Sequence, residues 1–598
     1  MTPKPDSIQA SVPSLTMGNV ITIGFQVFRL NFNDHFVRSL LSHLWLWLAM
    51  LGGLLVFGIA LFFSFALSST GGFPNTSAGV LGVAIGTVFA LPFTLFTGAR
   101  MFAVSGLMTR MGFNTLRKWV EPDELYRQTI LRRLWTYLAA WVFSSLIVLL
   151  ICGWLLGIGF YVFVLLSPTW QAFLLQIADS QLRGTFVLVT FTLGLIYVLG
   201  AVMVGYYLSA RLWFFDAVLA IEDRHSALTS LLRSWELTRG KGWSVITIMF
   251  TASLITLPIL LLASSINVFV PFVSLIAGVI MLPLWQAVKA VNFYELVTAK
   301  TGLLFDLDSL SSDPRRFLRR VAMQTPEGVE LDFALGGIGS RAIAWMVDQT
   351  ILYLVLAVFW VAGGWTYIYV VLPMLTDRFE AFSVDELNLW VGAIAGILSF
   401  AIANGYFISF ETIWRGQTPG KRLAKIRVVR DDGQPIGVKE ATLRSFVGWF
   451  DLGFFFIGLM LVMLGRSEKR LGDMAAGTLV IQDEKSSQQG AAIVPTSFST
   501  LTKDTVEILT AQTNTAVLSM DRYFVLQNFL GHRAELSAKD RKSATSKLAR
   551  QLRSLLMPHS PDALGTIPDE NLVEAAYLVC RVGRDDLYAT EQQEFDYS

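Results

Sequence analysis

Two stretches of the sequence place an aspartate seven residues after an arginine, at the start of a long apolar run. SRAIAWMVDQTILYLVLAVFWVAGGW contains Arg341 and Asp348, and RSFVGWFDLGFFFIGLMLVML contains Arg444 and Asp451. Seven residues of α-helix rise about 10.5 Å and return to nearly the same face, so each aspartate would lie deeper in a bilayer than its arginine. A carboxylate in hydrocarbon costs roughly 3 kcal/mol or more, so these groups are expected to face other polar groups.

A third apolar run, 388–412, carries two polar residues at matching depths. Glu411 is expected at the level of the two arginines, and Asn404, seven residues earlier, at the level of the two aspartates. The prediction is a deep polar layer and a shallow ionic layer. The deep layer is Asp348, Asn404 and Asp451, and the shallow layer is Arg341, Glu411 and Arg444.

Two kinds of chemistry fit this cluster. Asp348 and Asp451 could be exchangeable carboxylates of a proton or cation site, because two neighbouring acids cannot both ionise cheaply and one tends to hold a proton. Arg341 and Arg444 would then tune their affinity. The alternative is a structural clasp, in which the arginines reach lipid phosphates and the aspartates bond to backbone groups or to those arginines. The sequence leaves both readings open.

Four further charged residues are expected in cytosolic loops. Asp473, in KRLGDMAAG, is expected to accept from Arg470 or from turn amides and so fix its loop. Lys421 and Arg422, in GQTPGKR, are expected to meet anionic headgroups. GQTPGKR lacks the spacing and the final Ser or Thr of a phosphate-binding loop.

Other functional classes lack support in the sequence. The net charge of +2 gives no bulk basic surface for nucleic acid. Two cysteines and five scattered histidines show no spacing typical of a metal site, so neither a metal nor a cofactor is expected. Hydrolase elbows, zinc-protease helices and dinucleotide fingerprints are absent from the sequence, and an enzyme is therefore not predicted.

Composition and block length predict an all-α polytopic membrane protein. Hydrophobic residues make up 54% of the chain and charged residues 15%. Eight apolar blocks reach the length of about 20 residues that a spanning helix needs. These blocks are 40–66, 78–104, 134–166, 186–215, 243–264, 268–293, 342–364 and 388–412. Basic residues gather in the loops 105–133, 216–242 and 294–340 and are nearly absent from the alternate loops, which predicts a cytoplasmic N-terminus.

A ninth apolar block, 443–465, has basic residues on both flanks. It is predicted to be a re-entrant hairpin that bends near Gly453–Gly458, and an ordinary ninth crossing is the alternative. Around it, the strand-like segments 425–436, 477–481 and 328–335 predict a small cytosolic β-element.

Residues 326–484 resemble the RDD family of bacterial membrane proteins. The matching stretches are TPEGVELDFALGGIGSRAIAWMVD, RGQTPGKRLAKIRVVRDDGQPI, RSFVGWFD and KRLGDMAAGTLVI. The resemblance implies a compact membrane domain, with the arginine and aspartates that name the family at Arg341, at Asp348 and at Asp451 or Asp473. Roles in ion transport have been proposed for some members of that family.

Residues 1–300 are predicted to form a six-helix membrane domain with interfacial amphipathic helices. Their apolar faces are Ile21, Phe25, Phe28 and Phe32 in one helix and Leu228, Leu231, Leu232 and Trp235 in another. TMGNVITIGFQVFRLNF and ALTSLLRSWELTRGKGW resemble the membrane domain attached to some glycerophosphodiester phosphodiesterases. The catalytic barrel of those enzymes has no counterpart in the sequence, so their activity does not transfer.

Residues 485–598 are predicted to be a cytosolic linker and a helical tail, with Leu548, Leu552 and Leu555 on one side of a helix. The whole chain is expected in the bacterial inner membrane, with both termini cytoplasmic and the lipid bilayer as its first partner. The predicted function is transport of a proton, a cation or a small solute. The alternative is a non-transporting scaffold that organises lipid or partner proteins, with residues 500–598 available to a cytosolic protein.

Overall fold

The computed structural model describes most of the first 483 residues and parts of the tail. The described residues are 15–69, 75–117, 132–176, 180–222, 225–267, 273–301, 314–324, 330–376, 384–453, 457–465, 467–483, 505–506, 508–509, 525–526, 529–530, 533, 538–556 and 567–579. The chain forms two compact units. One is Val27–Phe250 with Leu275–Lys300, and the other is Met1–Gln26 and Thr251–Ser274 with Thr301–Ser598. The predicted domains at 1–300, 326–484 and 485–598 stay a prediction.

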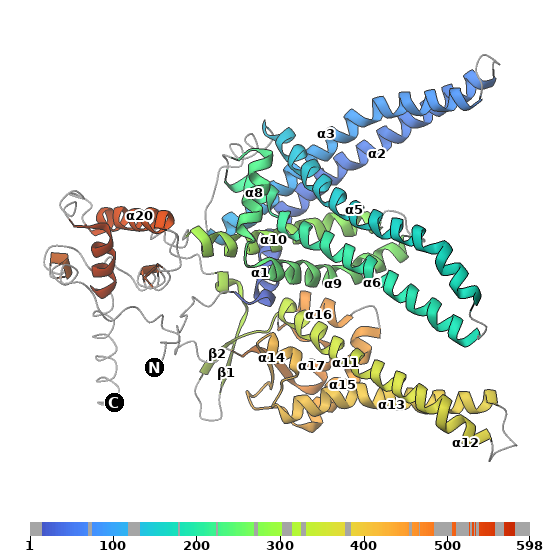
Figure 1. Cartoon of the computed structure of the whole chain (residues 1–598). Coiled ribbons are helices and arrows are strands. Elements are labelled where there is room, and N and C mark those ends of the chain that lie inside the picture. The colour runs from blue at the N-terminus through green and yellow to red at the C-terminus, as the bar shows by residue number, and fades with distance from the viewer. Residues whose placement is uncertain are drawn as a thin grey trace, which may run out of the picture. The chain divides into compact units, whose positions relative to one another are not determined.

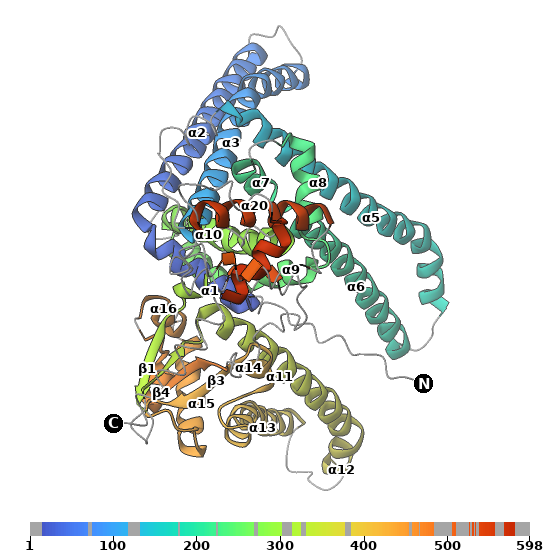
Figure 2. The same cartoon turned by 90° about the vertical axis from the view of Figure 1, so that its left-hand side faces the viewer.

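Helices, most of them long, build the unit that contains residues 27–250 (Figures 1 and 2). They are α2 (Phe32–Ser69), α3 (Asn75–Arg117), α5 (Leu134–Gln176), α6 (Ser180–Leu212), α7 (Phe215–Ile221), α8 (Ala227–Leu237) and most of α10 (Val273–Thr301). Residues of α1 (Met17–Leu30) and α9 (Gly242–Ile266) are divided between the two units. Helices α2 and α3 lie side by side, as do α5 and α6.

A proline inside α10 shows how these long helices keep their backbone groups satisfied. Pro283 has no N–H to donate to the carbonyl of Val279, four residues earlier. The hydroxyl of Ser39, on α2, donates to that carbonyl over 2.6 Å. The side chain of one helix therefore replaces a hydrogen bond that the sequence of the other cannot make.

Six helices in the described part of the chain are long and apolar enough to cross a membrane. They are Leu134–Val162, Phe186–Ile221, Gly242–Ile266, Val273–Thr298, Ile338–Met374 and Asp385–Ile413. Each coincides with one of the eight predicted blocks, so a mostly helical, multi-pass membrane protein is confirmed. The other two blocks, 40–66 and 78–104, fall within α2 and α3, where many side chains lie outside the described residues. The count of eight spans stays a prediction.

The two predicted amphipathic helices differ in burial. In α1, every residue from Gly18 to Phe25 is buried, whereas an interfacial helix would expose one face. In α8, Leu231 is buried and Leu228, Leu232 and Trp235 are exposed, as apolar residues that face lipid would be, so the interfacial position of α8 stays a prediction. Ser226 is the N-cap of α8, and its hydroxyl accepts from the backbone N–H of Thr229.

The second unit holds the remaining helices up to residue 483. They are α11 (Ile338–Thr366), the π-helical turn η2 (Tyr367–Val371), α12 (Leu372–Thr376), α13 (Val384–Ile413), α14 (Pro419–Leu423), α15 (Val438–Gly453), α16 (Ile457–Leu464) and α17 (Leu471–Ala476). The short 3₁₀-helix η1 (Pro314–Phe317) precedes them.

Two small antiparallel sheets accompany these helices. Strand β3 (Ile426–Arg430) pairs with β4 (Thr478–Gln482), as the strand-like pattern predicted. Strand β2 (Glu330–Ala334) pairs instead with β1 (Arg320–Gln324), which the sequence had not suggested. A single bridge, from Leu335 to Ile481, connects the end of β2 to β4. The predicted β-element therefore exists, with one more strand than expected.

The ninth apolar block is divided between two helices. Helix α15 ends at Gly453 and α16 begins at Ile457, and residues 454–456 lie outside the described part. The start of the block contacts the chain that follows it, because Nη1 of Arg444 donates to Oγ1 of Thr478 over 2.7 Å. A re-entrant path is consistent with this return, and the choice between re-entry and crossing stays a prediction.

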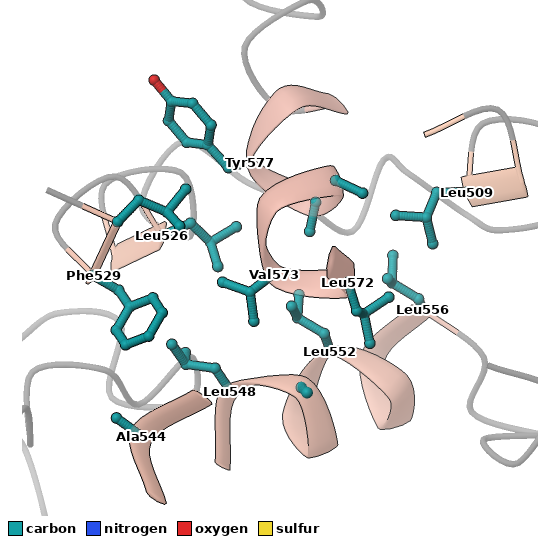
Figure 3. Close-up of a cluster of buried hydrophobic side chains, with 14 residues drawn as sticks. Leu509, Leu526, Phe529, Ala544, Leu548, Leu552, Leu556, Leu572, Val573 and Tyr577 are labelled. Carbon is teal, nitrogen blue, oxygen red and sulfur yellow. The ribbon is translucent and has the colours of Figure 1, made fainter. Parts of the chain in front are cut away.

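The tail has a hydrophobic core of its own (Figure 3). Leu548 and Leu552, on α20 (Ala538–Leu556), are fully buried against Leu572 and Val573 of a second helical segment. Leu555, predicted for the same side, is partly buried against this core. The predicted linker at 486–497 lies outside the described residues. The tail is thus more than a single helix, because its apolar side chains already have partners within the tail.

Candidate functional site

Three arginines converge on the carboxylate of Asp473, the acid that the sequence analysis had set apart as a loop residue. Nη1 of Arg341 lies 2.5 Å from Oδ2, and Nη1 of Arg444 donates to Oδ1. Arg470 adds its backbone N–H at 3.2 Å and its Nε at 3.4 Å. Burial by itself would raise the pKa of the Asp473 carboxyl. The charges of Arg444, Arg341 and Arg470 outweigh that effect and hold the pKa far below its usual value.

Arg444 continues this network toward α13. Its Nε lies 3.3 Å from Oε2 of Glu411, and only 2% of its surface is exposed. The other oxygen of Glu411 accepts from the ammonium of Lys421. Lys421 was expected to meet lipid headgroups; it has Glu411 as a partner, and the headgroup contact stays a prediction. Arg422 was also expected to meet headgroups. Its Cζ lies 5.3 Å from the centroid of the Trp414 ring.

Asp348 holds the first turn of the short helix α14. Its Oδ1 accepts from the backbone N–H of Gly420 at 2.8 Å and from the hydroxyl of Tyr406 at 2.9 Å. Its Oδ2 accepts from the hydroxyl of Thr418 at 2.5 Å. Thr418 is the N-cap of α14, so Asp348 satisfies groups that a helix start leaves without intrahelical partners. The carboxylate is 1% exposed.

Asp451 holds the first turn of another short helix, α17, in the same way. The backbone N–H groups of Leu471 and Gly472 donate to its two oxygens at 3.1 and 3.4 Å. Nε of Arg470 lies 3.8 Å away. A repeated spacing in the sequence thus corresponds to a repeated arrangement: in both cases an aspartate on a long helix accepts the first amides of a short one.

Asn404 joins α13 to α15. Its amide donates to the carbonyl of Phe400 one turn earlier in α13, at 2.9 Å. Its oxygen accepts from the hydroxyl of Ser445 at 2.9 Å and from Nε1 of Trp449 at 3.2 Å, both on α15. These contacts fix the packing of α13 against α15.

The two predicted layers are only partly assembled as expected. Arg444 and Glu411 of the shallow layer are in contact, and Arg341 joins them through Asp473. The deep layer does not form a shared acid pair. Among the hydrogen bonds and ion pairs of the described residues, none joins Asp348, Asn404 or Asp451 to one another. Each has its own partners: the short helices α14 and α17 supply donors to Asp348 and Asp451, and α15 supplies donors to Asn404.

The sequence analysis also missed an ion pair in the other unit. Nζ of Lys289 lies 2.8 Å from Oδ2 of Asp216, and both side chains are almost fully buried. The hydroxyl of Ser105 donates to the same oxygen over 3.2 Å. Asp216 had been assigned to a basic cytosolic loop. The sequence did contain a sign of this ion pair: Lys289 is a cation inside the apolar block 268–293, and such a cation needs a buried partner.

Metal binding gains no support from the described part of the chain, where no group of three or more His, Cys, Asp or Glu residues could hold an ion. Hydrogen-bond donors surround the buried carboxylates instead.

The part of the chain that contains these residues matches a known family. Residues 335–477 match the model of the RDD family. This is a family of membrane proteins, and the match includes all ten predicted site residues. We call residues 335–477 the RDD region. No curated protein matches the chain. No solved structure matches it either. The resemblance of residues 1–300 to a phosphodiesterase-associated membrane domain stays a prediction.

Proposed function

We propose that this integral membrane protein is a scaffold, in which the polar cluster of the RDD region holds helices together and does not carry ions. The observation behind this proposal is that each predicted exchangeable carboxylate already has fixed donors. Asp348 accepts three hydrogen bonds and Asp451 accepts two backbone hydrogen bonds. A cation would have to share these oxygens with the donors or displace them.

The ion-paired part of the cluster already has more cations than anions. Three acids, Glu411, Asp451 and Asp473, pair with four basic groups, Arg341, Lys421, Arg444 and Arg470, whereas Asp348 has neutral donors. An added cation would increase this excess of positive charge. Such a charge is expensive away from water, because interactions are weakly screened there. A proton-loaded or cation-loaded state is therefore unfavourable unless part of the network opens.

An ion would further disturb the backbone at both aspartates. If Asp348 turned toward an ion, the N–H of Gly420 and the hydroxyl of Thr418 would lose their acceptor. Buried donors without partners cost about 1–3 kcal/mol each. The same holds for Leu471 and Gly472 at Asp451. These costs favour a closed clasp over a site that loads and unloads.

As a scaffold, the protein would present its cytosolic parts at the bacterial inner membrane. The tail has its own core, and it would offer its outer surface to a protein partner. Both termini would be cytoplasmic, as the loop charges predict, and no enzyme activity is assigned. The alternative, transport of a proton, a cation or a small solute, depends on Asp348, within the candidate span Ile338–Met374, and on Asp451 of α15.

Flux measurements in proteoliposomes separate the two functions. Purified protein is reconstituted with an imposed proton, sodium or potassium gradient, and ion movement is followed with a dye in the lumen. A scaffold gives the leak rate of protein-free vesicles for each ion. Flux above that rate that is lost in an Asp348→Asn/Asp451→Asn variant of normal monodispersity contradicts the proposal.

A further inference from the structure

The first turns of α1 pack directly on the beginning of the RDD region, in the unit that contains both. A Cβ added at Gly18 would lie 2.5 Å from Cα of Ser340, and one added at Gly339 would lie 2.6 Å from Cβ of Ile21. Real Cβ atoms do not approach other atoms this closely. Only glycines at these positions let the two backbones meet, as in close helix pairs generally.

Hydrogen bonds add specificity to this close approach. The side-chain amides of Asn19 and Gln482 bond reciprocally, with Asn19 Nδ2 donating over 3.1 Å and Gln482 Nε2 donating over 2.9 Å. Both residues are buried. Two turns later in α1, Nε2 of Gln26 donates to Oε1 of Glu468 over 3.0 Å.

Helix α1 also completes the start of α11. The N-cap of α11 is Gly337, which has no side chain to accept from the first N–H groups of the helix. The hydroxyl of Thr22, on α1, accepts from the N–H of Gly339 over 3.2 Å. A residue more than 300 positions away therefore acts as the cap. Because α11 carries Arg341 and Asp348, a loss of this cap would reach the polar cluster.

We propose that Gly337, Gly339, Ser340 and Gln482 form a receptor site for one helix of defined sequence, and that residues 17–26 are its built-in ligand. The site selects a helix with a glycine at the crossing, an asparagine next to it and a threonine three residues after the asparagine. Gly18, Asn19 and Thr22 supply that pattern. The match to the RDD family begins at residue 335, so the ligand helix lies outside the matched region. The site would bind α1 whether or not the RDD region passes ions.

The test uses the full chain with Cys152 and Cys580 replaced by serine and with Ser340→Cys as the only thiol. Bound α1 covers position 340, so a maleimide should react slowly with it. Gly18→Leu cannot fit against residue 340, and we expect labelling at least about tenfold faster. Asn19→Leu, a milder change, should give an intermediate rate. Leu30→Ala, on an exposed position of the same helix, is the matched control and should leave the rate unchanged.

A peptide of residues 15–30 then tests whether the surface is a receptor. Added at about 1 mM, which is comparable to the effective concentration of a tethered segment, it should restore slow labelling in the Gly18→Leu variant. The same peptide carrying Asn19→Leu should not. Restored protection also shows that the variant has kept its fold. The proposal is wrong if Gly18→Leu labels at the parent rate, or if labelling is fast and the parent peptide has no effect.

Discussion

Replacing Asp348 with asparagine should destabilise the RDD region and leave ion permeability unchanged. Asparagine has the same shape, but it is neutral and offers one acceptor oxygen and one NH2 donor group. With its oxygen at the Oδ1 position it can still accept from Gly420 and Tyr406. Its NH2 group then faces the hydroxyl of Thr418, which at present donates to Oδ2. One hydrogen bond to a charged group is lost and two are weakened.

The size of the effect follows from these partners. A hydrogen bond to a charged group contributes about 1.5–3 kcal/mol, so Asp348→Asn should cost about 2–3 kcal/mol. Asp348→Ala removes every acceptor and leaves Thr418 and the Gly420 amide buried, so it should cost about 3–6 kcal/mol. A change of 1 kcal/mol shifts the unfolding midpoint by about 2–4 °C for a domain of about 150–250 residues. The asparagine variant should therefore unfold about 4–12 °C below the parent protein.

Thermal unfolding in detergent, followed by the loss of monodisperse protein, measures this difference. Asp385→Asn is a suitable control, because Asp385 is an exposed acid in the first turn of α13. That control should stay within about 0.5 kcal/mol of the parent. The reasoning is refuted if Asp348→Asn unfolds at the parent temperature and instead changes ion flux, since that outcome describes an exchangeable carboxylate.

Three more outcomes are expected from thermal unfolding and proteolysis. The folded-state pKa of Asp473 is far below the unfolded value of about 4, so the ionised carboxylate contributes its full stabilisation above about pH 4 and less as pH falls toward the folded pKa. The unfolding midpoint should therefore drop between about pH 5 and pH 3. Asp473→Asn should reduce that drop. Lys289→Met leaves Asp216 buried and unpaired and should cost about 3–5 kcal/mol, whereas Asp216→Asn/Lys289→Met together should cost less. Leu548→Ala should destabilise the tail core by about 2–5 kcal/mol, seen as faster proteolysis of the tail with an unchanged midpoint for the RDD region.

Local patterns predicted the elements well. The apolar blocks correspond to helices because length and hydropathy are properties of a contiguous segment. The segments around Val428 and Val480 alternate as strands do, and they pair in the structure. The cap of α8 at Ser226 is equally local, because it depends on residues three positions apart.

Contacts between distant segments were much harder to predict. Helical spacing gives the depth of Asp348 and Asp451, but it does not say which element lies beside each of them. Their partners come from α14 and α17, helices of five and six residues that resemble loops in the sequence. Asp473 was assigned to a local turn for the same reason, although the sequence between Arg470 and Asp473 has the spacing of a helix start. The hydrogen bond between Thr22 and Gly339 could not be predicted from either local sequence, because a threonine in a helix and a glycine at a helix start are each common without such a partner.

Under the proposed scaffold function, folding requirements account for the arginines and aspartates of the RDD region. Arg341 and Arg444, on different long helices, need a common anion, and Asp473 supplies it from a short helix. That short helix must be held in place, and Asp451 accepts its first amides. Each charge therefore positions the partner of another. An acid inside an apolar helix is thus evidence for ion transport only after its hydrogen-bond partners have been counted. A carboxylate has about four acceptor sites, and donors occupy three of them at Asp348 and two at Asp451, so an ion would have to share these oxygens with the donors.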